Sequence, residues 1–152
     1  APPFDLARAH CWFSADCFNR VWSLLDKPDR TPEERERMIS LSHASLAHWR
    51  ERADCTAKNL SIGYWQVSRV YSVLGQAENA RRYGELCLQA SAGEPSFYLG
   101  YAHEALARAA KLSGNPASAA AHLAAARHLA AQVTDAGERG ALESDLAGLA
   151  AG

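Results

Sequence analysis

Apolar residues recur at intervals of three and four along most of the chain, and Gly, Pro, Asp and Asn separate one such run from the next. This spacing places the apolar side chains on one face of an α-helix. The extended alternation of β-branched residues that indicates a strand does not occur. We therefore predict an all-α protein of about seven helices. The apolar stripe of the first helix comprises Ala7, Cys11, Phe18, Val21, Trp22 and Leu25.

Capping residues, prolines and glycines predict where these helices begin and end. Thr31 is suited to cap a helix that starts at Pro32, and Glu34 completes the pattern of a capping box. Gly75 and Gly114 each end a helix. The first predicted helix covers residues 4–26, and the second runs from 32 to a break at 53–56. The third ends at 75 and the fourth at about 92. The fifth covers 95–114, the sixth begins at 115–116, and the seventh runs from 135 to about 150.

Composition and charge narrow the classes of protein. The 152 residues, 48% of them hydrophobic and 22% charged, are enough for one domain with a single core. A formal net charge of −1 provides no basic field for nucleic acid, and no apolar run approaches the length that spans a bilayer. The cysteines form no CxxC pair, which favours reduced packing residues and a cytoplasmic location. They are Cys11, Cys17, Cys55 and Cys87.

A helix-Gly-helix pattern occurs twice, with its two glycines 39 residues apart in equivalent places. Each unit has a small residue inside its first helix, Gly at the turn and Ala five residues later. The first unit carries Ser68, Tyr71, Gly75 and Ala80. The second carries Ala107, Ala110, Gly114, Ala119, Leu123 and Ala126. Over about residues 59–133 this pattern resembles the tetratricopeptide repeat (TPR).

The chain departs from the TPR pattern at three points. Ala110 stands where an aromatic residue is usual, Gly84 stands where a large residue is usual with Tyr83 one place early, and the period is longer because of residues 91–95. The resemblance implies one domain over residues 1–152, in which antiparallel helical hairpins stack as a short right-handed array. Its parts would be a long N-terminal hairpin (1–54), two TPR-like units (55–92 and 94–133) and a capping helix (135–150).

The resemblance also implies a concave groove, because the first helix of each TPR pair lines such a face. The positions that map onto it are Ile62, Trp65, Arg69 and Ser72 in one unit and Tyr101, Glu104, Arg108 and Lys111 in the other. Its aromatic and basic groups suit a peptide, through stacking and carboxylate pairing. We therefore expect a protein–protein interaction module that binds a peptide segment or self-associates as a homodimer. The other interpretation is that Arg69 and Arg108 form a solvated helix face and Trp65 packs beneath the last helix.

Aromatic and histidine residues near the N-terminus support an alternative function. His10 and Cys17 share a face of the first helix, and an antiparallel second helix would bring His43 or His48 alongside. Together with Trp12 they would make the pocket of a small-ligand or metal-binding bundle. The spacings of zinc motifs are missing, so neither a metal nor a cofactor is predicted. No nucleophile elbow, phosphate loop or carboxylate pair occurs in a recognisable context, so we expect a binding protein rather than an enzyme.

Overall fold

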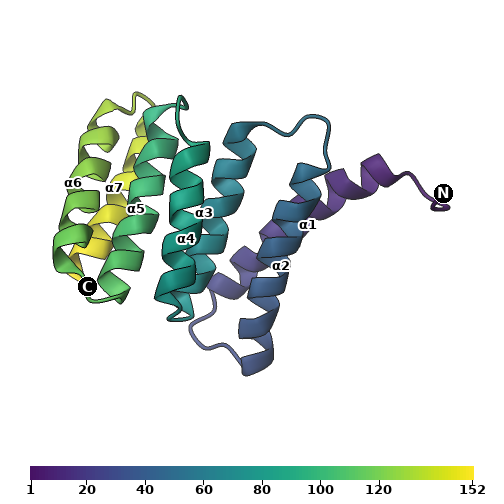
Figure 1. Cartoon of the computed structure of the whole chain (residues 1–152), viewed down its shortest axis with the longest axis horizontal. Helices are drawn as coiled ribbons and strands as arrows, with labels where there is room; N and C mark the ends of the chain where they lie inside the picture. Colours follow the sequence, from purple (N-terminus) through teal and green to yellow (C-terminus); the bar gives the residue numbers. More distant parts are fainter.

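The computed structural model describes all 152 residues and contains seven α-helices and no strand (Figure 1). The prediction of an all-α array of antiparallel hairpins is confirmed. None of the helices combines the length and the hydrophobicity that a bilayer crossing requires. The helices are α1 (Leu6–Leu25), α2 (Pro32–Arg50), α3 (Ala57–Val73), α4 (Ala77–Ala90), α5 (Ser96–Leu112), α6 (Pro116–Gln132) and α7 (Ala136–Ala151).

Side-chain caps set most of the helix starts. Thr31 and Glu34 form the predicted capping box at the start of α2. Asn115 and Asp135 cap α6 and α7, as their positions in the sequence indicate. The Asp5 carboxylate caps α1, so this helix begins two residues later than predicted. Because a cap satisfies N–H groups that lack a partner within the helix, these polar residues fix the ends of the hairpins.

Glycines with a positive φ make the turns inside the hairpins. Gly75 and Gly114 end their helices as predicted, with φ angles of 78° and 74° in the left-handed region that glycine adopts without strain. A Cβ atom at either position would have no atom within 4 Å, so backbone conformation rather than lack of space requires glycine. Gly93, with φ 82°, makes a third turn of this kind in the segment that lengthens the repeat.

The helices form two layers. Each helix packs against the next one in the chain, α3 also contacts α1 and α5, and α5 also contacts α7. The backbones of α2 and α4, and of α4 and α6, do not come close, although the rings of His43 in α2 and Tyr83 in α4 meet with centroids 5.2 Å apart. The odd-numbered helices therefore form a continuous layer, and the even-numbered helices pack onto it. The N-terminal half of α1 projects beyond the other helices (Figure 1).

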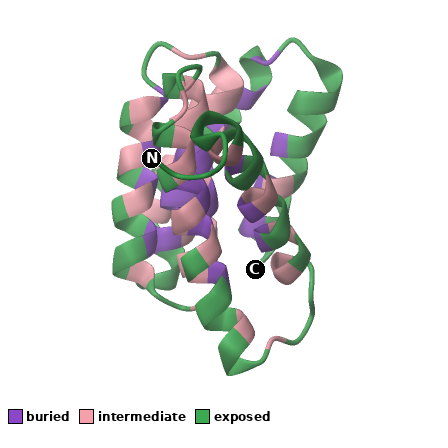
Figure 2. Cartoon of the chain, turned by 90° about the vertical axis from the view of Figure 1, so that its right-hand side faces the viewer, coloured by how far each residue is buried: buried purple, intermediate pink, exposed green.

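Small residues allow close approach where the helices cross. Ser68 of α3 is fully buried, and its hydroxyl donates to the carbonyl of Ala80 in α4 over 2.8 Å. A Cβ at Gly100 would lie 2.6 Å from Leu142 Cδ2, so this glycine lets α7 pack directly on α5. Buried residues lie along these crossings through the middle of the molecule (Figure 2). The core thus fixes the odd-numbered helices side by side.

Candidate functional site

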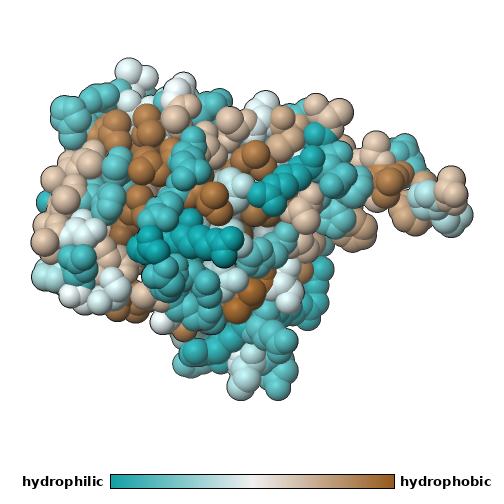
Figure 3. Space-filling view, viewed as in Figure 1, coloured by the Kyte–Doolittle hydropathy of each residue, from teal (hydrophilic) through white to brown (hydrophobic).

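A groove with a volume of about 360 Å³ opens on the layer of odd-numbered helices. All four of these helices line it, and Asp145 is its only charged lining residue. Figure 3 shows the other face, on which α2, α4 and α6 lie in front and hydrophilic side chains cover much of the middle. We call the groove the aromatic groove; its lining residues are Phe18 and Trp22 of α1, Ser61, Ile62 and Trp65 of α3, Phe97, Tyr98 and Tyr101 of α5, and Asp145 of α7.

The rings of the aromatic groove pack against one another across helix boundaries. The ring centroids of Trp22 and Trp65 lie 5.6 Å apart, which joins α1 to α3. The ring centroids of Trp65 and Tyr101 lie 5.4 Å apart with an interplanar angle of 77°, which joins α3 to α5. The rings of Phe97 and Tyr101 also meet edge to face, with an interplanar angle of 79°. Edge-to-face contacts of this kind hold rings in fixed orientations. The groove is therefore a preorganised apolar surface.

Glu104 adjoins the aromatic groove through Trp65 and is fully buried. Trp65 Nε1 donates to its Oε2 over 2.9 Å, Arg69 Nη1 donates to its Oε1 over 3.3 Å, and Arg108 Nε donates to the same Oε1. Burial, and next the charge of Arg108, lower the pKa of Arg69 against the opposing effect of Glu104. The two arginines thus stabilise a buried carboxylate. As a result, the groove lining is aromatic, and the predicted basic groups serve an internal ion network.

α7 covers part of the predicted concave face. Tyr101 donates its hydroxyl to Asp145 Oδ2 over 2.8 Å, and Lys111 Nζ donates to the Leu149 carbonyl over 2.8 Å. Burial, followed by the hydrogen bond and charge of Asp145, raises the pKa of Tyr101, so the phenol stays a donor. Lys111 satisfies a carbonyl at the C-terminal end of α7. The last helix therefore contacts Tyr101 and Lys111, while Trp65 lines the groove.

Six lining residues were not among the predicted groove positions. The sequence pattern marked Phe18 and Trp22 as part of the apolar stripe of α1, but register alone did not show that α1 and α7 extend the layer of α3 and α5. The signal that would have found them is the equivalent place of every odd-numbered helix in the array of hairpins. The six are Phe18, Trp22, Ser61, Phe97, Tyr98 and Asp145.

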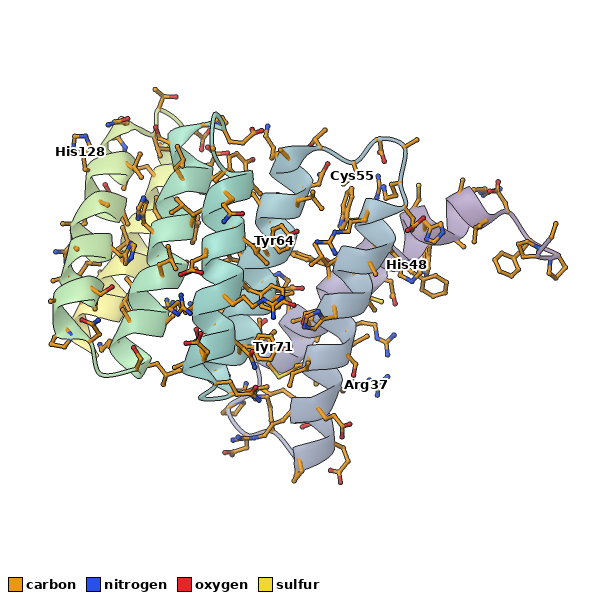
Figure 4. The ribbon with its side chains drawn as sticks, viewed as in Figure 1. Arg37, His48, Cys55, Tyr64, Tyr71 and His128 are labelled. Carbon is orange, nitrogen blue, oxygen red and sulfur yellow. The ribbon has the colours of Figure 1, made fainter.

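Two of the four residues proposed for the His/Cys pocket meet. His10 Nδ1 and His48 Nδ1 lie 2.9 Å apart, where α2 crosses the projecting part of α1 (Figure 4). His43 Nε2 instead lies 2.9 Å from the hydroxyl of Tyr71, and Cys17 is buried, which raises its pKa. No three His, Cys, Asp or Glu side chains gather as a metal-ligand set. The pocket predicted from these four residues is therefore not formed as a unit.

A second histidine pair, which was not predicted, joins α5 to α6. His103 Nδ1 and His122 Nδ1 lie 3.0 Å apart, and both side chains are half-buried. Burial lowers the pKa of both histidines, and the charge of His122 lowers that of His103 further. A hydrogen bond between two imidazoles needs a nitrogen without a proton, so the pair is incompatible with two imidazolium rings.

Comparison with known proteins gives no match: no protein-family model, no curated protein and no solved structure is significantly similar to this chain.

Proposed function

We propose that this chain is a protein–protein interaction module that binds a peptide segment of a partner in the aromatic groove. The observation that carries the proposal is the convergence of aromatic side chains from α1, α3 and α5, with Asp145 of α7 as the single charged group. Peptide-binding grooves combine apolar anchor pockets with a few placed polar groups. Rings that the fold already holds in place lose little conformational entropy when a peptide binds.

The proposal includes a TPR-like architecture, a non-catalytic role without a cofactor, and a cytoplasmic location. The hairpin array, the positive φ angles of Gly75 and Gly114 and the buried small residues Ser68 and Ala107 support the TPR-like part. The acidic groups at the groove, Glu104 and Asp145, are engaged by arginine, tryptophan and tyrosine donors, which supports binding rather than acid–base chemistry. All four cysteines are free thiols, as in a reducing compartment, and the net charge of −1 favours a protein partner over nucleic acid.

Selection of peptides from a phage-displayed library against the folded protein tests the proposal. Ile62 lines the groove and is 36% exposed, so Ile62→Glu places a charge in the groove without removing a core side chain. Val73 is in the same helix, is 37% exposed and lies outside the groove, which makes Val73→Glu a matched control. We expect selected peptides to bind Ile62→Glu at least about 10-fold more weakly than the native protein, because the new carboxylate must be desolvated.

The control variant decides how the result is interpreted. Selected peptides should bind Val73→Glu as tightly as they bind the native protein, and circular dichroism should show equal helicity for all three proteins. Peptides that bind Ile62→Glu with undiminished affinity, or a selection that enriches no peptide, would contradict the proposal.

Self-association is the second mode of binding that we propose. The projecting end of α1 and the residues just before it carry large apolar side chains that are largely exposed, a feature typical of interaction surfaces. They are Phe4, Leu6, Trp12 and Phe13, which are 43–67% exposed. We expect sedimentation velocity to show a homodimer that Trp12→Ser shifts towards monomer. A native protein that stays monomeric at every concentration would end this part of the proposal.

A further inference from the structure

The aromatic groove contains one carboxylate whose hydrogen-bonding capacity is only partly used. Asp145 Oδ2 accepts a hydrogen bond from Tyr101, and no side chain or backbone donor of the chain is bonded to Oδ1. No Lys, Arg or His lies within salt-bridge distance of this carboxylate. An ionised carboxylate in a largely apolar groove binds most favourably to a cation that also donates hydrogen bonds. Asp145 therefore leaves a position for a cationic group of a ligand.

The rings beside Asp145 favour the same kind of ligand. Trp65 and Tyr101 meet at 77° and form a corner, and the Tyr101 hydroxyl places Asp145 at that corner. The faces of Trp and Tyr rings attract cations. The chain itself uses one ring of the groove in this way, because Lys58 Nζ lies 5.3 Å from the ring centroid of Tyr98. The corner thus combines ring faces with a carboxylate.

The basic groups nearest the corner do not occupy it. Arg69 and Arg108 both donate to the buried Glu104, and these two positive charges balance the two negative charges of Glu104 and Asp145. Lys58 is partly exposed, so solvent and salt screen its repulsion of a cation at the corner. A ligand cation at the corner would lie within hydrogen-bond range of Asp145, and solvent screens this attraction much less. The attraction therefore outweighs the repulsion.

On the basis of the proposed function, we infer that the aromatic groove takes an arginine side chain of the bound segment, with its guanidinium against the Trp65–Tyr101 ring pair and the carboxylate of Asp145. Arginine fits better than lysine for two reasons. Its planar guanidinium stacks on an aromatic face, and its five N–H donors reach a carboxylate from that stacked position. The partner segment is then an arginine-containing peptide.

An NMR titration with two matched probes tests this inference. N-acetyl-arginine amide carries the guanidinium, and N-acetyl-citrulline amide is its uncharged isostere. The indole N–H signals of Trp22 and Trp65 report on the groove, and that of Trp12, which is 67% exposed outside it, reports on non-specific stacking. We expect saturable shifts at Trp65 with an affinity about 10-fold higher for the arginine probe. In Asp145→Asn, which keeps an acceptor for Tyr101, the two probes should bind alike.

Three results would overturn the inference: equal affinity for the two probes, a preference for arginine that persists in Asp145→Asn, or arginine shifts at Trp12 without shifts at Trp65. These results leave the proposed function standing, because that function is decided separately by the peptides that discriminate between Ile62→Glu and Val73→Glu. Binding of such peptides without any preference for arginine would show a peptide groove of different specificity.

Discussion

At the scale of single residues, register in the sequence shows which side chains share a face but not which of them is buried. Trp65, Arg69, Glu104 and Arg108 were assigned to one face, and the structure does bring them together. Full burial of Glu104 depends on how α3 and α5 pack, which no local pattern contains. Because the buried carboxylate takes both arginines, the groove lining differs from the basic surface that residue types alone suggest.

The ion network around Glu104 makes a prediction about stability. Glu104→Gln removes the negative charge and leaves Arg69 and Arg108, with 23% and 21% of their side chains exposed, without a counter-ion. We expect the free energy of unfolding to fall by roughly 3 kcal/mol, because the remaining guanidinium charges are poorly solvated. Urea unfolding monitored by circular dichroism measures this change.

A surface carboxylate provides the control for that measurement. Glu78 pairs with Arg81 on the exposed side of α4, and Glu78→Gln should leave the urea midpoint almost unchanged because solvent screens the pair. Equal midpoint shifts for Glu104→Gln and Glu78→Gln would show that the buried network does not stabilise the fold.

At the scale of helices, the ends were predictable because capping and turn residues act locally. The capping box at Thr31, the caps Asn115 and Asp135 and the turns at Gly75 and Gly114 all lie where the sequence indicates. Pairing between helices was not predictable to the same degree. His103 and His122 are 19 residues apart and meet only because α5 and α6 pack as a hairpin, so no spacing in the sequence marks the pair.

Two Gly→Ala changes should have opposite effects on stability. Gly114 has φ 74°, where a Cβ is strained, so Gly114→Ala should lower the free energy of unfolding by about 1 kcal/mol. Gly140 lies inside α7 with no atom within 4 Å of an added Cβ, so Gly140→Ala should raise it by roughly 0.5–1 kcal/mol. Thermal unfolding of the two variants and of the native protein shows whether each change raises or lowers the free energy of unfolding. A stabilising Gly114→Ala would contradict the turn geometry.

The histidine pair between α5 and α6 predicts lower stability in acid. Burial places the pKa of His103 and His122 in the folded protein below the ordinary 6.5, so the unfolded chain binds more protons as the pH falls. The contribution of the pair is fully present above pH 6.5 and is lost as the pH falls through the folded pKa values. Native stability should therefore drop between pH 7.5 and pH 5.5, and it should drop less in His122→Asn.

A surface histidine provides the matched control for the pH dependence of stability. His128 lies on the exposed side of α6 (Figure 4), so His128→Asn should keep the native difference between the two pH values. His43 is half-buried, and His48 pairs with His10. Both are present in every variant, so their contribution to the pH dependence of stability cancels in the comparison. A native-like pH difference in His122→Asn would exclude the pair as its source.

At the scale of the whole molecule, the sequence predicts the number of helices and their hairpin order, because both follow from local patterns. The continuous layer of odd-numbered helices depends on contacts between α1 and α3 and between α5 and α7, which are distant in the sequence. That layer creates the aromatic groove, and three of the eight predicted groove positions, Ile62, Trp65 and Tyr101, line it. Arg69, Glu104 and Arg108 form the buried network, and Lys111 donates to α7. Ser72 takes part in neither.

Paramagnetic relaxation measures most directly whether a peptide segment binds on the odd-numbered layer, as we propose. A selected peptide with a nitroxide label, added to the ¹⁵N-labelled full chain, broadens backbone signals near its binding site. The structure predicts the strongest broadening in the groove-lining parts of α1, α3, α5 and α7, and weaker broadening along α2, α4 and α6, which lie one helix layer further away. Broadening centred on the even-numbered helices or on the projecting end of α1 would contradict binding on the odd-numbered layer.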